Sequence, residues 1–291
     1  MDAGPPLEPT APATLDPRRE LLELVRQARG LAELDLLLGL GTTPVPALAR
    51  PQALVQAAPA PAPAAAPRPA TPTLPAPPAP AQAPAPPAGP ADEAGLAARR
   101  AEAEARLHAL AQRMQGCTRC PLSEGRTQLV FGQGDAAAEV VFVGEAPGYH
   151  EDKEGLAFIG PAGQLLTKMI QAMGLEREEA FICNVAKCRP PNNRTPTPPE
   201  MATCLPFLEE QLEIVRPRVI CALGKTAAVG LGLLRPGDSI TRARGQWREW
   251  RGIPTMITFH PAYLLRSPSE KRHAWQDLQA LFPHISRRRT S

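Results

Sequence analysis

Four cysteines fall into two pairs whose spacing suits a metal centre. Cys117 and Cys120 form a CxxC pair, whereas fifteen residues, many of them Pro or polar, separate Cys188 from Cys204. Four thiolates can hold either a tetrahedral zinc ion or a [4Fe–4S] cluster. A typical zinc ribbon uses two short CxxC knuckles, so the wide second pair favours the cluster. The spacing alone leaves both metals open.

Further polar positions lie at the ends of short apolar runs. The turn GEAPG (144–148) follows the run 140–143, Asn184 lies near the end of the run 181–185, and His260 follows the run 256–259. Open parallel α/β sheets bind ligands at the carboxyl ends of their strands, so these positions are predicted to converge. The amide of Asn184 can pair with the edge of a base or cap a turn. His260 can donate to a developing oxyanion or serve only the fold.

Phe158 is an aromatic residue in an unusual setting. It lies in the segment EGLAFIGPAG, between Gly155 and Gly160, and not on an apolar stripe. Its ring therefore either fills the core or stacks on a nucleobase.

Continuous apolar runs alternate with helical patterns after residue 92. Such runs are typical of parallel strands covered on both faces. The predicted strands are 140–143, 181–185, 219–223 and 256–259. The predicted helices are 162–173, 199–215, 225–234 and 269–281, preceded by one that leads from Asp92 to Cys117. We expect an α/β fold, a three-layer α/β/α sandwich around a short parallel sheet, with Cys183 and Cys221 in its core.

An Ala/Pro-rich stretch divides the chain. Residues 44–92 hold 17 of the 37 prolines, and such a segment buries too little apolar surface to offset its ordering entropy. It is predicted to be a disordered linker between a short helical segment, 1–43, and a folded domain, 93–285, which ends in a basic tail, 286–291. Residues 1–43 cannot form a core alone. They either dock on a partner protein, which we favour, or pack on the main domain.

The charge is unevenly distributed, although the net charge is only +3. Residues 235–291 hold eleven Lys or Arg and four Asp or Glu, which suits either binding to a polyanion such as DNA or an ordinary solvated surface.

No stretch reaches the ~18 apolar residues that a membrane span requires. The acidic, Pro-rich N-terminus is unlike a secretory signal, and six cysteines without such a signal favour the reducing cytosol.

Ordered motifs from Cys117 to Leu281 resemble those of the family 4 uracil-DNA glycosylases, the iron–sulfur branch of their superfamily. The motifs are CxxCPL, GEAPGxxED, FxGxAGxLL, NVxKCRPPxNR, RPRVICALGKTAA, RGxW and HPAxLLR. The resemblance does not cover residues 1 to about 100. It implies a base excision repair enzyme that flips deoxyuridine out of DNA, hydrolyses the N-glycosidic bond and releases uracil, leaving an abasic site.

The resemblance also implies roles for the motif residues. The ligands of a [4Fe–4S] cluster would be Cys117, Cys120, Cys188 and Cys204. The residues in contact with uracil would be Gly144, Glu145, Ala146, Phe158, Asn184 and His260. The segment 260–266 would enter the duplex, and its DNA contacts would be Leu264, Leu265 and Arg266.

Catalysis would involve His260 and a carboxylate. Cleavage leaves negative charge on uracil O2, which His260 and the backbone amides of 144–148 would stabilise. Several relatives in the superfamily carry an Asp where this chain has Ala146, and there the Asp orients the attacking water. Ala146 cannot do so. Either Glu145 or Glu151 helps to place the water, or stabilisation of the leaving group supplies most of the acceleration.

Two other functions fit parts of the sequence. One is a noncatalytic DNA-binding module with a four-cysteine zinc site, and the other, ranked lower, is a relative that traps uracil-DNA covalently through a histidine-bearing loop, for which 154–163 shows no match. No Lys in GEAPG or HPAYLLR suggests a Schiff base, which favours a monofunctional hydrolase.

Expected partners are uracil-containing DNA, single- or double-stranded, and a replication or repair protein for the N-terminal segment. We expect a cytoplasmic, nucleoid-associated monomer.

Overall fold

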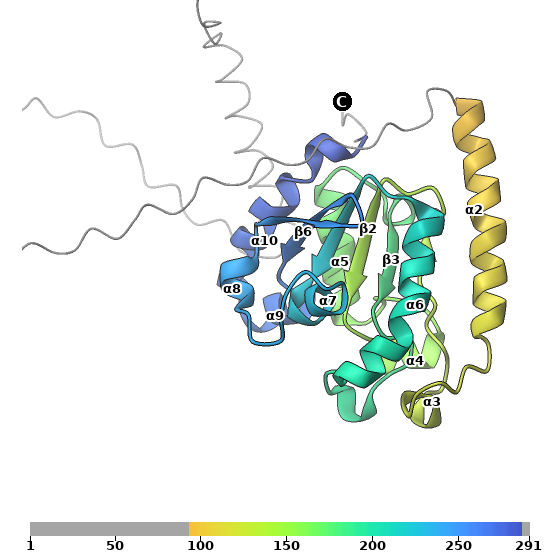
Figure 1. The fold of residues 1–291 in the computed structure, drawn as a ribbon. Helices are drawn as coiled ribbons and strands as arrows, with labels where there is room; N and C mark the ends of the chain where they lie inside the picture. Colours follow the sequence, from red (N-terminus) through yellow and green to blue (C-terminus); the bar gives the residue numbers. More distant parts are fainter. Residues whose placement is uncertain (1–92, 287–291) are drawn as a thin grey trace, which may run out of the picture.

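The apolar runs of the sequence form the centre of a six-stranded sheet in the computed structural model, which describes residues 93–286 (Figure 1). Four parallel strands occupy the middle of the sheet, in the order β3 (Phe181–Asn184), β2 (Val140–Gly144), β4 (Val219–Leu223) and β6 (Ile253–Thr258). Almost every residue in them is buried, because helices cover both faces. The predicted three-layer α/β/α architecture is confirmed.

Each edge of the sheet carries a short antiparallel strand that the sequence did not predict. β1 (Gln133–Gly134) pairs with β3, and β5 (Trp247–Trp250) pairs with β6. β1 is too short to show a pattern, and β5 has the charged pair Arg248 and Glu249 at its centre. Charged or very short edge strands resist pairing with other chains.

Helices form the two outer layers. One layer contains α2 (Glu93–Met114), α6 (Pro198–Val215) and α7 (Gly224–Gly230). The other contains α5 (Pro161–Ala172), α9 (Pro261–Arg266) and α10 (Lys271–Gln279). Three short helices lie in connections, namely α3 (Leu122–Gly125), α4 (Tyr149–Glu154) and α8 (Ile240–Ala243). Of these elements, α3, α4, α7 and α9 lie at the carboxyl ends of the strands, the lower end in Figure 1.

A buried network fixes α10 to the end of β6. Asp277 in α10 is 2% exposed and accepts hydrogen bonds from Thr258 Oγ1 at 2.7 Å and from Arg244 Nε at 2.9 Å. Burial raises the pKa of Asp277, and the bonds from Arg244 and Thr258 oppose that shift. Thr258 lies two residues before His260, so the network holds the strand end from which His260 projects.

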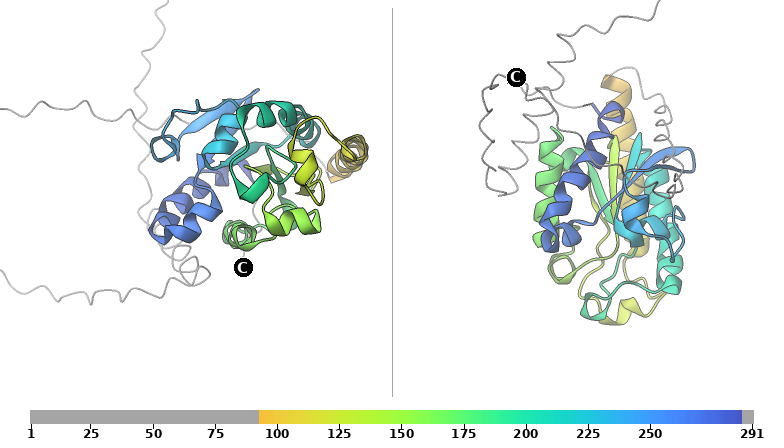
Figure 2. Two further views of the ribbon diagram at one scale, coloured as in Figure 1. Left: turned by 90° about the horizontal axis from the view of Figure 1, so that it is seen from below. Right: turned by 90° about the vertical axis from the view of Figure 1, so that its left-hand side faces the viewer.

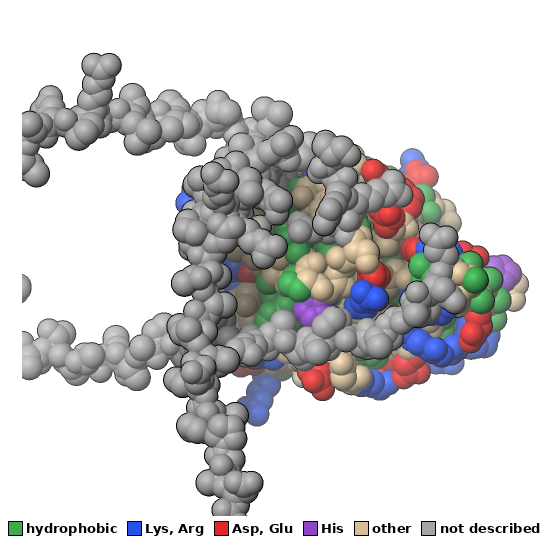
Figure 3. Space-filling model, turned by 90° about the horizontal axis from the view of Figure 1, so that it is seen from above, with side chains coloured by type: hydrophobic (Ala, Val, Ile, Leu, Met, Phe, Trp, Pro, Cys, Tyr) green, Lys and Arg blue, Asp and Glu red, His purple; other side chains and the backbone are tan. Residues whose placement is uncertain are grey.

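The described residues leave some predictions unaddressed. The N-terminal helical segment, the Ala/Pro-rich linker and residues 287–291 of the basic tail lie outside 93–286. Within that range no helix is long and apolar enough to cross a membrane. Seen from the amino ends of the strands, the visible surface of the described residues carries both acidic and basic side chains (Figure 3).

Candidate active site

The sheet register places Gly144 beside Asn184 at the carboxyl ends of β2 and β3. A Cβ on Gly144 would lie 2.4 Å from Asn184 Oδ1 and 2.4 Å from Phe158 Cζ, so a larger residue there would displace these side chains. Phe158 is buried in the loop before α5 and has a φ of 52°, a conformation that few aromatic residues adopt. Three predicted uracil contacts therefore meet at one point.

The side-chain oxygen of Asn184 is buried without a hydrogen-bond partner. Asn184 is 2% exposed, and no group in the described part of the chain donates to its Oδ1 atom. Leaving such an acceptor unpaired in the interior costs ~1–3 kcal/mol. A ligand with an N–H group at this position would recover that free energy.

His260 is a neutral imidazole at physiological pH. Burial lowers its pKa to about 4, and the nearby positive charge of Arg266 acts in the same direction. Its Nδ1 atom accepts a hydrogen bond from the backbone N–H of Ala262 at 3.1 Å, which caps α9. The proton of the neutral ring therefore resides on Nε2. The ring lies 5.7 Å from that of Phe158, centroid to centroid.

Glu151 joins the two loops that surround Gly144. One carboxylate oxygen accepts from the backbone N–H of Gly148 at 3.1 Å, and the other accepts from those of Ile159 at 3.0 Å and Gly160 at 2.8 Å. These bonds link GEAPG to the loop that carries Phe158. Glu145 is half-buried, and its backbone carbonyl accepts from the N–H of Ala186 at 3.0 Å.

Helix α9 presents two of the three residues predicted to contact DNA. Leu265 is 44% exposed, and Arg266 is also exposed. Leu264 is only 1% exposed and packs in the apolar core beneath the helix. The helical phase therefore turns the side chain of Leu264 inward in this structure, and its contact with DNA stays a prediction.

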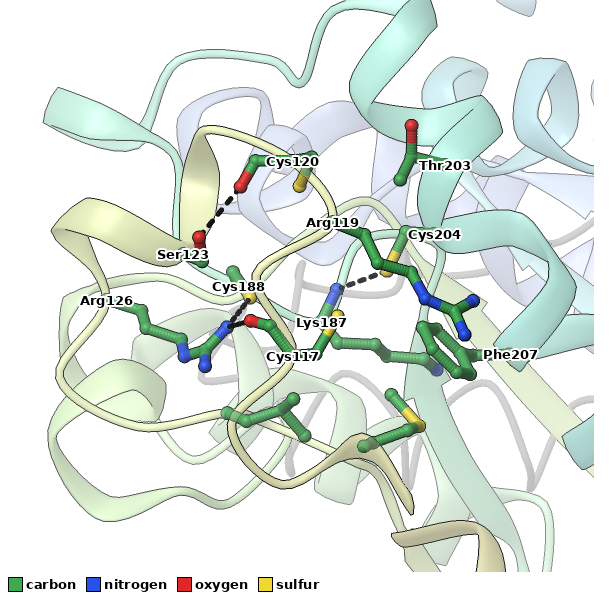
Figure 4. Close-up of a pocket in the computed structure, with 12 residues that line it drawn as sticks. Cys117, Arg119, Cys120, Ser123, Arg126, Lys187, Cys188, Thr203, Cys204 and Phe207 are labelled. Carbon is green, nitrogen blue, oxygen red and sulfur yellow. Dashed lines mark hydrogen bonds between the residues drawn. The ribbon is translucent and has the colours of Figure 1, made fainter.

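The four predicted ligand cysteines line one cavity, which is open to solvent (Figure 4). Cys117 and Cys120 come from the loop after α2, Cys188 from the loop after β3, and Cys204 from α6. All four thiols are free. In residues 93–286 no three His, Cys, Asp or Glu side chains gather closely enough to ligate a single metal ion.

Two N–H groups point at the sulfur atoms. Arg126 Nη1 donates to Cys188 Sγ at 3.3 Å, and the backbone N–H of Lys187 donates to Cys204 Sγ at 3.3 Å. Burial raises the pKa of Cys188 and raises that of Cys204 to about 11, so both must lose protons to bind a metal. Four free thiols with N–H donors aimed at sulfur fit the ligand set of a [4Fe–4S] cluster.

A small apolar cluster connects the cysteines to GEAPG. Its buried members are Leu122, Ala186 and Cys188, and half-buried Cys120 and Ala146 pack against them. Ala146 belongs to GEAPG, so the two loops share one packed interface.

Known proteins are similar to this chain over much of its described part. Residues 131–279 match the model of the uracil DNA glycosylase superfamily. The type-4 uracil-DNA glycosylase of Thermotoga maritima is 49% identical over 171 residues, which cover 58% of this chain and 88% of that protein. Those of Pyrobaculum aerophilum and Archaeoglobus fulgidus are 41% and 40% identical, each over 60% of this chain, and the matches cover 93% and 91% of those proteins. The chain belongs to the type-4 uracil-DNA glycosylases.

For this type-4 uracil-DNA glycosylase, the structure adds residues that the sequence did not single out. Gly224 has a φ of +87°, and a Cβ there would lie 2.9 Å from His260 Cβ. Gly163 allows α5 to approach the backbone of Phe158, since its Cβ would lie 1.8 Å from the Phe158 carbonyl oxygen. For Gly224, the signal available in the sequence was a glycine directly after an apolar strand. The roles assigned to individual side chains stay predictions.

Proposed function

We propose that the protein removes uracil from DNA by hydrolysing the N-glycosidic bond of an extruded deoxyuridine, leaving an abasic site. The observation that carries the site assignment is the unpaired, buried Oδ1 atom of Asn184 beside Gly144 and Phe158. Inside the duplex, the hydrogen-bonding groups of a base are out of reach of the protein. Flipping the nucleotide brings these groups into such a site. A noncatalytic DNA-binding module leaves this unpaired acceptor unexplained.

Asn184 selects uracil by the direction of its hydrogen bonds. Its Oδ1 atom accepts from N3–H of uracil, and its amide nitrogen donates to O4. Cytosine has no hydrogen on N3 and presents an amino group in place of O4, so both bonds are lost. The ring of Phe158 stacks on the base.

His260 supplies the donor for the leaving group. As the bond from C1′ to N1 breaks, negative charge develops on uracil O2, and the Nε2–H group of His260 donates to it. Backbone amides of GEAPG assist. Removing one such donor costs ~3 kcal/mol of transition-state stabilisation. The neutral ring can donate from Nε2 because its Nδ1 atom is the acceptor for the N–H of Ala262.

The two carboxylates have different roles in this proposal. Glu151 is a positioning residue, since its oxygens are already engaged by three backbone N–H groups. Glu145 is the candidate for placing the attacking water. Ala146 has no side chain that could do so.

A [4Fe–4S] cluster would be held by Cys117, Cys120, Cys188 and Cys204. When bound, it would join the loop after α2, the loop after β3 and helix α6 into one rigid unit. Its proposed contribution is structural. Through the apolar cluster of Leu122, Ala186 and Cys188, against which Ala146 packs, that unit supports the GEAPG turn.

The decisive experiment is release of free uracil. Purified protein is incubated with an oligonucleotide containing one deoxyuridine and with otherwise identical oligonucleotides containing thymidine or deoxycytidine. We expect free uracil and an alkali-labile site from the first alone, with no strand cleavage before alkali treatment. Intact uracil-containing DNA after incubation with iron-loaded protein would overturn the proposal.

A further inference from the structure

An exposed Tyr149 and a half-buried Arg189 form a pair beside the uracil site. Tyr149 is 56% exposed, which is unusual for an aromatic residue at the start of a helix that packs on the site. The guanidinium of Arg189 lies 5.2 Å from the centroid of the Tyr149 ring, and the ring of His150 meets that of Tyr149 edge-on at 5.6 Å. The tyrosine is thus held in place while one side of it faces solvent.

The pair bridges the two loops that define the site. Tyr149 directly follows GEAPG, and Arg189 directly follows Cys188. Arg189 is itself oriented, because its Nε atom donates to Asn193 Oδ1 at 2.7 Å. Within residues 93–286 no carboxylate forms an ion pair with Arg189, so its charge is available to an anion.

The position of the pair complements that of α9. α4, with Tyr149, follows β2, whereas α9, with Leu265 and Arg266, follows β6, and β4 lies between these strands. The view from below shows α4 and α9 on different sides of the strand ends (Figure 2, left). A DNA strand whose nucleotide enters the site between them must pass both helices.

We infer that Tyr149 and Arg189 bind the DNA strand that flanks the flipped nucleotide, on the side away from α9. Tyr149 stacks on an unpaired base, and Arg189 contacts a phosphate. Stacking on an aromatic ring requires a base that is free of its partner, so the surface fits single-stranded DNA better than duplex. This inference rests on the proposed function, because it takes the uracil site as the point from which the strand extends.

Binding of single-stranded DNA tests the surface directly. The probe is a fluorescent oligonucleotide with a tetrahydrofuran abasic-site analogue, titrated at several salt concentrations. We expect Tyr149→Ala to weaken binding by roughly 5- to 100-fold and Tyr149→Phe by less than about 2-fold, because the stacking face remains. Arg189→Gln should reduce the slope of log K against log salt by about 0.7. A charge-matched control, Arg106→Gln on α2, should leave the slope closer to that of the wild type.

Nested oligonucleotides locate the contact on the strand. The penalty of Tyr149→Ala should disappear when the strand is shortened on one side of the abasic site and persist when it is shortened on the other. Equal binding by Tyr149→Ala and wild type, with equal iron content and melting temperature, would overturn the inference. If Arg189→Gln loses iron, the comparison of the two Tyr149 variants decides. Failure of wild type to release uracil would count against the proposed function, whereas these binding differences concern only the surface.

Discussion

The backbone of Gly224 lies directly against the side chain of His260. Gly224 begins α7 at the end of β4, and its φ of +87° turns the chain past the imidazole. A Cβ on Gly224 would lie 2.9 Å from His260 Cβ, closer than such atoms approach. The position of the proposed catalytic histidine therefore depends on the absence of a side chain at the first residue of α7.

Gly224→Ala should damage catalysis beyond its effect on stability. The methyl group displaces His260 from the leaving group, so we expect kcat to fall by about 100-fold, comparable to loss of one oxyanion donor. Uracil release under single-turnover conditions measures this. Gly232→Ala is the matched control, since Gly232 has a φ of +72° and a Cβ added there would meet nothing within 4 Å. It should lose ~1 kcal/mol of stability and keep its activity. Equal kcat in the two variants would contradict the prediction.

Asn184→Ala should separate activity from stability. Because Oδ1 of Asn184 has no partner, its removal breaks no hydrogen bond at that atom, and we expect the free energy of unfolding to change by less than about 1 kcal/mol. The kcat/KM for uracil release should fall by about 100-fold or more, since the site loses its readout of the base. Urea denaturation and uracil release provide the two measurements.

Gln211→Ala provides the contrast, because it removes a buried amide that has hydrogen-bond partners. Gln211 accepts from Lys187 Nζ and donates to the carbonyl of Phe131 at 2.8 Å. Its loss leaves the buried Nζ group of Lys187 without that partner, so stability should fall by ~1–3 kcal/mol. A large stability loss in Asn184→Ala, matching that of Gln211→Ala, would show that Asn184 serves the fold.

Glu151→Gln should loosen the loops around Gly144. A glutamine offers one carbonyl oxygen and one NH₂ group, and the NH₂ group cannot accept from Gly148 or from Ile159 and Gly160. We expect a stability loss of ~1.5–3 kcal/mol and a higher KM for the DNA substrate. Glu154→Gln, at an exposed position on the same helix, should change stability by less than about 0.5 kcal/mol. Unchanged KM in Glu151→Gln would contradict the positioning role.

The protonation of His260 should occur at a more acidic pH than that of an ordinary histidine. Its pKa in the folded protein, about 4, lies below the ordinary value of 6.5, so the unfolded chain takes up a proton first as pH falls. Its contribution to stability is therefore complete above pH ~6.5 and is lost progressively between ~6.5 and ~4. The imidazole signal in NMR spectra, assigned by His260→Gln, should titrate near pH 4. A midpoint near 6.5 would contradict a ring that its surroundings keep neutral at physiological pH.

Cys204→Ala should remove the proposed cofactor, whereas Cys183→Ala should not. Both residues are buried, but only Cys204 lines the cavity shared by the four thiols. Protein prepared anaerobically should contain about four iron atoms per chain as wild type and as Cys183→Ala. Cys204→Ala should lose iron and colour. One zinc ion per wild-type chain, without iron, would favour the alternative of a four-cysteine zinc site.

The sequence predicted the central strands well because burial on both faces leaves a continuous apolar run. β4 has the predicted bounds, Val219–Leu223. The edge strands were missed because a strand with one neighbour need not be apolar, as β5 shows with Arg248 and Glu249.

Single residues of the site were harder to predict than the strands that carry them. Leu264 and Leu265 are adjacent and chemically alike, and only the phase of α9 separates a core residue from a surface one. The contact between Gly224 and His260 joins residues 36 positions apart, and a close approach between two backbones leaves no signal in side-chain chemistry.

On the roles proposed above, the shortness of α9 restricts which molecules can be substrates. His260 caps its first turn, and Leu265 and Arg266 end it about 9 Å away. A helix this short moves as a rigid unit. If Leu265 and Arg266 shift when they insert between stacked bases, His260 at the other end of the helix shifts with them. Free deoxyuridine in the uracil site would leave Leu265 and Arg266 without a DNA contact, so we expect it to be a poorer substrate than the polymer.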